Sequence, residues 1–461
     1  MKQKLRKQQF KSLLLAVLTF MPLAASAQVE INETNFPDEN FRAYLFEQDY
    51  GKDGVITEEE IGSIWKIVVN NKNISSLKGV EHFAALTWLE CDNNQLTSLD
   101  VAENTKLDVL YCSYNQLTSL DVSKNTELTS LGCYYNQLTS LNMSNNLKLI
   151  WLRCFNNQLT TLDISGCTVL PTLRCNNNQL ISLDISNNTA LKDLDCSHNQ
   201  LTSLDVSQNT ALTDLDCEEN QLTSLNVANN LALTKLDCSS NQLASLDVSN
   251  NTALTRLSCG GNQLTSLDVS QNAELDDLYC YSNQLTSLDV SNNTALALLS
   301  CGSNQLTSLD VSNNTALTRL SCNGNQLTSL VVSKTNTVLT EIECYTNMIS
   351  GTGMDSFINS LPENTTGETH SLVIYNPNDY PYEDGNVCTT DHVAEAKAKG
   401  WSVKDWWGND YEGVTPSGIL LPTVEGIDEN TPIYDLSGKR VNNLQGKKGI
   451  YIIGGKKVIV K

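Results

Sequence analysis

Residues 254–274 read LTRLSCGGNQLTSLDVSQNAE, and this stretch decides the fold because the chain repeats it along much of its length. Its cysteine, Cys259, belongs to a series in which a cysteine returns every 21 residues. The series comprises Cys91, Cys112, Cys133, Cys154, Cys175, Cys196, Cys217, Cys238, Cys259, Cys280, Cys301 and Cys322, and Cys344 follows after one extra residue. A fixed period of this kind is typical of a solenoid, so we expect thirteen stacked turns of one coil.

Each turn offers six apolar positions whose spacing indicates short strands. In the quoted copy they are Leu254, Leu257, Cys259, Leu264, Leu267 and Val269. Alternation in Leu-x-Cys and in Leu-Asp-Val points two side chains of each strand inward. One turn cannot bury them alone, but stacked turns cover each other, and each large side chain that is fully buried contributes about 1.5–3 kcal/mol. Neither half of the unit is long enough for a helix, which predicts a mainly β coil with parallel ladders.

An asparagine follows each ladder cysteine by three residues, from Asn94 in the first copy to Asn347 in the last. It stands at the bend, where strand pairing ends and backbone groups would otherwise lack partners. We therefore expect a ladder of structural hydrogen bonds here, and no binding site.

The repeat resembles the leucine-rich-repeat family, whose signature L-x-x-L-x-L-x-x-N/C-x-L it meets with cysteine in place of the third leucine. Its nested halves, L-x-x-L-x-C-x-x-N and L-x-x-L-D-V-S-x-N, are similar to the short-unit subtype called IRREKO. The resemblance implies a leucine-rich-repeat solenoid of 13 short coils. The expected fold class is mainly β, with small helical or αβ caps at both ends and a small β domain at the carboxyl terminus.

Residues 1–27 have the layout of a secretory signal peptide, with five basic residues, an apolar run and the small-residue site Ala25-Ser26-Ala27. We expect an exported protein with no integral membrane segment after cleavage. The whole chain has 30 Lys and Arg against 52 Asp and Glu, so loss of residues 1–27 leaves 25 basic against 52 acidic residues and a net charge of −27. A chain this acidic repels phosphate backbones, which excludes nucleic acid as a partner.

The remaining sequence divides by composition into a few segments. We expect a signal peptide at 1–27, an amino-terminal cap with an entry turn at 28–85, repeats at 86–349, a carboxyl-terminal cap at 350–412, a linker at 413–431 and a β tail at 432–461. Predicted helices are Phe41–Phe46, Glu58–Ile67, Met354–Leu361 and Thr390–Lys399. Predicted strands outside the repeats are His370–Tyr375, Ile433–Leu436, Gly449–Ile453 and Lys457–Val460.

Two stretches near the carboxyl end carry further resemblances. NVCTTDHVAEAKAKGW, from Asn386 to Trp401, is similar to terminal caps of internalin-like repeat proteins of Bacteroidota. PIYDLSGKRV and GIYIIGGKKVIVK, within Pro432–Lys461, resemble the sorting domain of the type nine secretion route in the same bacterial group. This implies a bacterial protein, secreted or associated with the outer surface, whose tail contacts the secretion machinery. From the residues alone, the tail could equally be a hairpin that docks on the acidic coil.

Ahead of the coil, DYGKDGVITEEE at residues 49–60 resembles an EF-hand calcium loop. Acidic residues stand at loop positions one, five and twelve, but Gly51 removes the ligand at position three. The ligands would be Asp49, Asp53, the Val55 carbonyl and Glu60. Two interpretations stay open: a structural calcium ion, or an acidic helix-turn-helix that caps the first repeat without an ion. No other cofactor is expected.

Ladders of cysteine and aspartate raise the question of disulfide or metal chemistry. The cysteines replace the family's inward leucine and neighbouring side chains run parallel, so we expect buried free thiols. The aspartate of Leu-Asp-Val is replaced by the neutral Asn142 and Asn226 in two turns, which favours hydrogen bonds to the local backbone over calcium. No nucleophile-histidine-acid constellation or phosphate-binding loop is present in the sequence, so an enzyme is not expected.

The outward residues of the Leu-x-x-Leu-x-Cys strand vary between copies, and they define the candidate site. What we call the aromatic surface, on the first five turns, comprises Trp88, Tyr111, Tyr114, Tyr134, Tyr135, Trp151, Arg153, Phe155 and Arg174. What we call the acidic band, on the next three turns, comprises Lys192, Asp193, Asp195, Asp214, Asp216, Glu218, Glu219 and Asp237. Exposed aromatic residues are enriched at binding hot spots, although rings stacked along the ladder would also stabilise the sheet.

These features favour a cell-surface binding or adhesion protein that presents its repeats to an extracellular protein or glycan. The alternative is a purely structural surface element without a dedicated ligand.

Overall fold

The computed structural model describes residues 28–364, 367, 369–377, 384–415, 432–435, 438–441, 449–453 and 456–460. The predicted signal peptide and residues 416–431 of the predicted linker lie outside these ranges. The chain divides into two compact units, residues 1–285 and 286–461. Within the described residues, no helix is long and apolar enough to cross a membrane.

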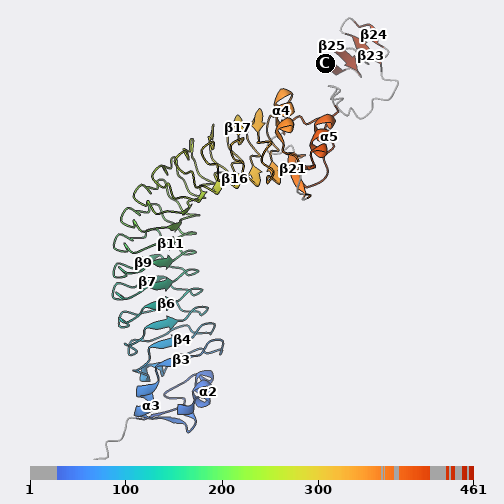
Figure 1. Cartoon of the computed structure of the whole chain (residues 1–461). Coiled ribbons are helices and arrows are strands. Elements are labelled where there is room, and N and C mark those ends of the chain that lie inside the picture. Colours follow the sequence, from blue (N-terminus) through green and yellow to red (C-terminus); the bar gives the residue numbers. More distant parts are fainter. Residues whose placement is uncertain are drawn as a thin grey trace, which may run out of the picture. The chain divides into compact units, whose positions relative to one another are not determined.

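The first unit begins with a small cap of helices and short strands (Figure 1). Its elements are β1 (Val29–Glu30), α2 (Glu39–Glu47), the 3₁₀ turn η1 (Asp49–Gly51), β2 (Val55–Ile56) and α3 (Glu58–Ser63). Strands β1 and β2 pair antiparallel. Asp38 caps α2, because its carboxylate accepts from the backbone N–H groups of Asn40 and Phe41. Phe41 and Leu45 of this helix are fully buried, as is Phe36, whose ring contacts that of Phe41.

The predicted helix over Glu58–Ile67 is wrong in its second half. Helix α3 ends at Ser63, and Lys66–Val68 forms β3, the first strand of the main ladder. Ile67 pairs with Leu89, the inward leucine of the next strand, and is itself fully buried. The spacing from Ile67 to Leu89 is 22 residues, so a search at a period of 21 does not find this strand.

Parallel three-residue strands then follow one per turn, in register. In spatial order they are β3 (Lys66–Val68), β4 (Trp88–Glu90), β5 (Val109–Tyr111), β6 (Ser130–Gly132), β8 (Trp151–Arg153), β10 (Thr172–Arg174), β11 (Asp193–Asp195), β12 (Asp214–Asp216), β13 (Lys235–Asp237), β14 (Arg256–Ser258) and β15 (Asp277–Tyr279). The predicted fold class, a mainly β solenoid with short parallel coils, is confirmed. The second halves of the repeats pair more sparsely. In this unit the pairs are β7 (Ser140–Asn142) with β9 (Thr161–Asp163) and an isolated bridge from Asp100 to Asp121.

Two kinds of asparagine close the bends between these strands. Asn136 is a member of the predicted ladder: its amide donates to the carbonyls of Cys112 and Cys133, and its oxygen accepts from the N–H of Leu117. Asn125 belongs to a second ladder, on the opposite bend, and donates to the carbonyls of Val101 and Asn104. Both side chains are buried, so they satisfy backbone groups that water cannot reach.

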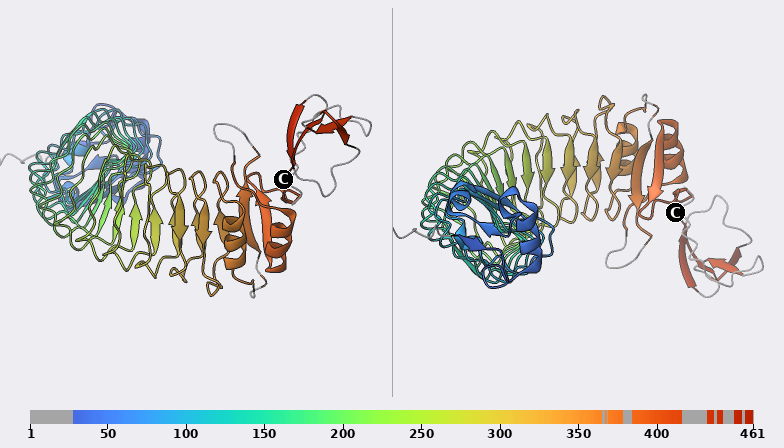
Figure 2. Two further views of the ribbon diagram at one scale, coloured as in Figure 1. Left: turned by 90° about the horizontal axis from the view of Figure 1, so that it is seen from above. Right: turned by 90° about the horizontal axis from the view of Figure 1, so that it is seen from below.

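The second unit continues the same pattern and then changes it. Its strands β16 (Leu298–Ser300), β18 (Arg319–Ser321), β20 (Glu341–Glu343), β21 (His370–Tyr375) and β22 (Trp401–Asp405) are parallel, and β17 (Ser308–Asp310) pairs with β19 (Ser329–Val331). Helices α4 (Thr352–Ser360) and α5 (Thr390–Ala398) precede β21 and β22 (Figure 2). The prediction of strand His370–Tyr375 is confirmed, and the two predicted helices are confirmed within two residues at each end.

The histidine of the cap helix α5 connects it to α4. His392 accepts from the N–H of Thr389, the residue that caps α5, and its other ring nitrogen lies 2.8 Å from Asp355 of α4. It therefore links the two helices of the carboxyl-terminal cap.

The tail forms an antiparallel sheet in the order β24–β23–β25–β26. Its strands are β23 (Ile433–Asp435), β24 (Arg440–Val441), β25 (Gly449–Ile453) and β26 (Lys456–Val460). The three predicted strands are confirmed, and β24 is an addition.

Candidate functional site

The outward side chains of the ladder lie in two columns, because each strand points its central leucine inward and its first and third residues outward. In β8, for example, Leu152 is fully buried, while Trp151 and Arg153 flank it on the other face. Parallel pairing in register then places equivalent residues of successive turns about 4.8 Å apart. A site on this face is therefore determined by which residues share a column.

One aromatic group lies directly on the strands. Trp88 contacts Tyr111 edge to face with ring centroids 6.1 Å apart, and Tyr111 contacts Trp151 in the same way at 5.6 Å. Between Tyr111 and Trp151 stands Gly132, whose missing side chain lets the two rings meet across an intervening turn. A Cβ atom added at Gly132 would lie 3.2 Å from the Tyr111 ring and 3.5 Å from the Trp151 ring.

Each indole of this group is covered by a cation. Lys66 Nζ lies 4.2 Å from the Trp88 ring centroid, and the Arg153 guanidinium lies 4.3 Å from that of Trp151. Glu90 joins the first pair, because it accepts from Trp88 Nε1 at 2.6 Å and lies 3.5 Å from Lys66 Nζ. Burial of Glu90 opposes ionisation, but hydrogen bonds from Trp88, Asn70 and Lys66 hold its pKa below the ordinary value.

A second aromatic group lies on the bend that follows the strands. Tyr114 stacks on Tyr135 with centroids 4.6 Å apart, and Tyr134 stacks on Phe155 at 4.5 Å. Edge contacts from Tyr134 to Tyr114 and to Tyr135 connect the two stacks. Tyr114 and Tyr135 are 48% and 45% exposed, so the group presents aromatic area to solvent. Among residues 28–364, no ring contact joins this group to the first.

The backbone at Tyr114 and Tyr135 is left-handed, with φ of 53° and 52°. Every turn needs this conformation at the same position, which asparagine fills in neighbouring turns and other residue types in later turns: Asn93, Asn156, Asn177, His198, Glu219, Ser240, Gly261, Ser282, Ser303, Gly324 and Thr346. A left-handed residue other than glycine costs about 1–2 kcal/mol, and asparagine tolerates it better than a bulky side chain. Two tyrosines at these positions therefore retain strain that asparagine would relieve.

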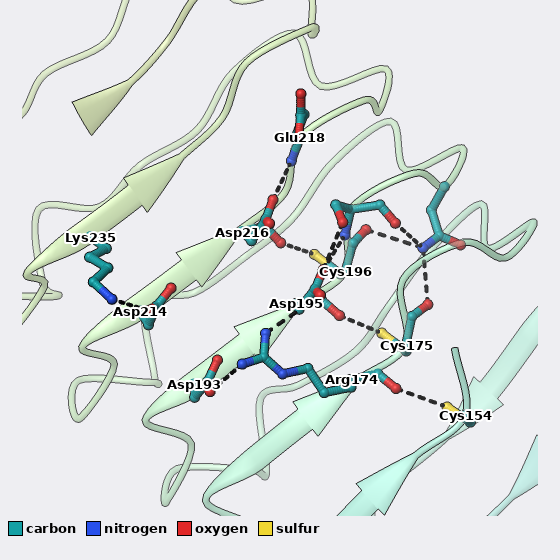
Figure 3. A network of polar contacts seen from close by, with 12 residues as sticks. Cys154, Arg174, Cys175, Asp193, Asp195, Cys196, Asp214, Asp216, Glu218 and Lys235 are labelled. Atoms are coloured by element: carbon teal, nitrogen blue, oxygen red, sulfur yellow. Dashed lines mark hydrogen bonds and ion pairs between the residues drawn. The ribbon is translucent and has the colours of Figure 1, made fainter. Parts of the chain in front are cut away.

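Arg174, predicted as part of the aromatic surface, is drawn into the acidic band instead. Its guanidinium lies 2.6 Å from Asp193 and 3.5 Å from Asp195 (Figure 3). The structure thus brings the other eight predicted residues into or beside the ring groups, and it makes Arg174 the border between the two surfaces.

Within the acidic band, carboxylates outnumber their cations. Asp195, Asp216 and Asp237 follow one another in register on β11, β12 and β13. Lys235 lies 3.6 Å from Asp214, and His198 lies 2.7 Å from Glu219, but Asp216 has no ion pair with any residue that the structure describes. Burial, together with the charges of Asp195 and Asp237, raises the pKa of Asp216 to about 7, although the hydrogen bond from the N–H of Glu218 opposes the shift.

Comparisons with known proteins identify the family of the chain. No protein-family model matches it. Over 73 residues, 15% of the chain, it is 37% identical to internalin J of Listeria monocytogenes, a match that spans 8% of that curated relative. The solved functional domain of InlJ from L. monocytogenes, which includes a cysteine ladder, is 30% identical with a TM-score of 0.63, and the match covers 94% of this chain and 96% of that domain. This chain belongs to the internalin-like leucine-rich-repeat proteins.

Two more distant structures share the fold of this internalin-like protein. A leucine-rich-repeat protein of Leptospira interrogans has a TM-score of 0.57 at 23% identity, covering 69% of this chain and 92% of that one. The internalin InlF of L. monocytogenes has a TM-score of 0.52 at 22% identity, covering 83% and 99%. The leucine-rich-repeat fold that the chain shares with the InlJ domain is typical of protein-binding surface proteins.

The aspartate ladder of the internalin-like coil bonds to its own backbone, as predicted. Asp121 accepts from the N–H of Ser123 at 2.9 Å, and Asn142, which replaces aspartate in the next turn, accepts from Ser144 in the same way. The hydrogen bonds from Ser123 lower the pKa of Asp121.

The carboxylates of the EF-hand-like loop are not gathered around one point. Asp49 lies 2.5 Å from Lys52, whose hydrogen bond and charge lower the Asp49 pKa. Asp53 accepts from the N–H of Val55, and Glu60 accepts from the N–H and hydroxyl of Thr57 in a capping box at the start of α3. Calcium at Asp49, Asp53, Val55 and Glu60 stays a prediction, and binding would require Asp49 and Glu60 to exchange these partners for the ion.

All fifteen cysteines of the internalin-like protein are free and buried. Several ladder thiols contact the carbonyl of the next turn, as Cys217 does at 3.4 Å to Asp237. Cys167 replaces a bend asparagine, and its sulfur faces the carbonyls of Met143 and Asn146 at 3.5 and 3.8 Å.

The sequence did not reveal three features that build the site. Lys66 shares the column of Trp88 and would be found by extending the ladder back one turn with a 22-residue step. Gly132 has no side chain to single out, and the left-handed position of Tyr114 and Tyr135 becomes visible only when the backbone is known.

Proposed function

We propose that this internalin-like protein is an exported surface protein that binds another protein through the aromatic surface. The observation that carries this proposal is the exposure of the stacked rings of Tyr114 and Tyr135, which are 48% and 45% exposed. Asparagine serves this position in adjacent turns, so the tyrosines are not needed for the fold. Aromatic side chains kept exposed at positions that asparagine can fill support a binding role.

The arrangement of the rings supports a protein partner over a glycan. A sugar ring stacks on a free aromatic face, but here Tyr114 and Tyr135 cover each other, and Arg153 and Lys66 cover the indoles of Trp151 and Trp88. What remains exposed includes ring edges and charged groups, which suit the mixed apolar and polar contacts of a protein interface.

A purely structural role is the second candidate, and the same stacking favours it. Aromatic pairs contribute about 0.5–1.5 kcal/mol beyond their buried area, so the rings also stabilise the coil. Removing the rings distinguishes the two roles. If the rings bind a partner, their removal abolishes binding, and if they are purely structural, their removal lowers stability alone.

The test is an array of extracellular matrix proteins and glycans probed with the mature protein and with the double variant Trp88→Ala, Trp151→Ala. We expect capture of a protein by the unmutated chain and its loss in the double variant, with a folded circular dichroism spectrum in both. Tyr279→Ala is the matched control, since Tyr279 is an outward ring on β15, away from both ring groups. Equal capture by all three chains, or capture of glycans alone, would reject the proposal.

Export is part of this proposal. The signal-peptide layout of residues 1–27 supports entry into the secretory route, and the resemblance of Pro432–Lys461 to a type nine sorting domain supports passage to the outer surface of a bacterium of the Bacteroidota.

A further inference from the structure

We infer that the bound protein presents a carboxylate to Arg153, so that the partner is acidic where it meets the aromatic surface. The inference rests on the proposed function and names the chemistry of its partner. The observation behind it is that Arg153 has no carboxylate partner among the described residues.

Arg153 differs from the other arginines of the repeats in having no carboxylate partner. Arg174 lies 2.6 Å from Asp193, Arg256 lies 3.7 Å from Asp277, and Arg319 lies 2.6 Å from Glu341. Arg153 is exposed and forms no ion pair or side-chain hydrogen bond with any residue that the structure describes. In a chain with 52 acidic residues, an arginine without a carboxylate partner in the described part of the chain is available to an external anion.

The neighbours of Arg153 keep it free and hold it in place. In register beside it stand Gly132 on β6, which has no side chain, and Arg174 on β10, which is of like charge. Its guanidinium rests on the Trp151 ring at 4.3 Å, so the side chain is ordered before any ligand arrives. A pre-ordered planar guanidinium with free N–H groups suits bidentate recognition of a carboxylate.

The acidic band does not cancel this charge. Arg174 forms ion pairs with Asp193 and Asp195, the acidic residues nearest to Arg153 along the ladder. The next carboxylates in the columns are Asp214 and Asp216 on β12 and Glu90 on β4, each three strands from β8, and Glu90 is already paired with Lys66. At about 4.8 Å per strand, this separation exceeds the screening length of about 8 Å in physiological salt. A carboxylate placed over Arg153 is therefore attracted by the arginine more than it is repelled by the acidic band.

The position of Arg153 links it to the ring contacts. It shares the outer face of β8 with Trp151 of the first ring group and stands two residues before Phe155 of the second, which lies on the following bend. Apolar contacts on both sides would exclude water from a carboxylate held there, which strengthens a charged hydrogen bond. Tryptophan, tyrosine and arginine together are also the residues that dominate protein-binding hot spots.

The experiment selects random displayed peptides on the immobilised full chain. We expect the selected peptides to be enriched in aspartate and glutamate over the starting library and to lose binding to the Trp88→Ala, Trp151→Ala variant. Arg153→Gln should weaken them by about tenfold or more, the effect of losing one charge-assisted hydrogen bond. Arg319→Gln, which removes an arginine already paired with Glu341, should leave them unchanged.

A double-mutant cycle then separates direct contact from a shift of Trp151. The acidic residue of a selected peptide is changed to its amide and measured against the unmutated chain and Arg153→Gln. If the two groups touch, the combined loss is smaller than the product of the single losses. Independent effects, or selected peptides without acidic enrichment that still need the tryptophans, would overturn the inference and leave the proposed function standing. Selected peptides that bind the Trp88→Ala, Trp151→Ala variant as well as the unmutated chain would overturn both the inference and the proposed function. Failure to select any peptide would do the same.

Discussion

Carboxylates of the same repeat differ sharply in what surrounds them, and Asp216 shows the consequence for single residues. Its folded pKa of about 7 stands above the ordinary value of 3.8, because burial and the charges of Asp195 and Asp237 disfavour ionisation. A raised pKa means that the folded state binds the proton more tightly. The associated stability is present in full below the ordinary pKa and is lost as the pH rises through 7.

Asp216→Asn should therefore stabilise the protein only at higher pH. At pH 8 the amide removes a repelled charge while its oxygen keeps the bond to the N–H of Glu218, and we expect the melting temperature to rise by about 2 °C. At pH 5 the unmutated side chain is already protonated, and the two proteins should melt together. Thermal unfolding followed by circular dichroism at both pH values measures this difference.

Asp247→Asn provides the control, since hydrogen bonds from Ser249 lower the Asp247 pKa and the carboxylate is already favoured. It should give no gain at pH 8. A gain of equal size at pH 5 and pH 8 for Asp216→Asn would show that packing, and not charge, sets the effect.

At the scale of the elements, Glu60 could serve two roles in the loop that leads into α3. Glu60 completes the capping box with Thr57 and is also the twelfth residue of the EF-hand-like loop. If calcium binds, it should raise the melting temperature of the amino-terminal cap, and Glu60→Gln should abolish that shift. Glutamine can still accept from Thr57, so the helix start survives the change. Calorimetry with and without calcium decides, and no effect of calcium on the unmutated protein would leave a cap without an ion.

The cysteine ladder is an element whose chemistry follows from burial. Burial raises the pKa of Cys154 to about 12 and that of Cys217 well above its ordinary value, so neither thiol is ionised at neutral pH. We expect ladder thiols to react with alkylating agents only after unfolding, and without prior reduction. Mass spectrometry of native and denatured protein tests this, and intact bridges between consecutive repeats would contradict it.

The elements also show where sequence reasoning succeeds and where it stops. Inward and outward positions of every repeat follow from alternation, and Trp151 and Arg153 were assigned to the outer face correctly. Strand β3 was missed because its step is 22 residues, and β22 because only Trp401 and Val403 alternate as buried residues in a short segment. The pairing of Arg174 with Asp193 required the register between turns, which a single strand does not contain.

At the scale of the whole molecule, the proposed export route depends on the two ends of the chain. Deleting Pro432–Lys461 should trap the protein in the periplasm of a host with the type nine route, because the sorting address is then lost. Fractionation and surface labelling of cells that express the full and shortened chains measure this. Unchanged surface display of the shortened chain would contradict the sorting role of the tail.

The central claim is that the internalin-like protein keeps exposed tyrosines at these left-handed positions for binding. The most direct measurement compares the affinity for a captured protein and the melting temperature of the unmutated chain with those of Tyr114→Asn, Tyr135→Asn. Asparagine relieves left-handed strain but forfeits the ring stack, so stability should change by no more than about 1 kcal/mol. Ser240→Asn, at the same backbone position in the acidic part of the coil, is the control. The account predicts at least tenfold weaker binding by the double variant with the fold intact, and unchanged affinity would contradict it.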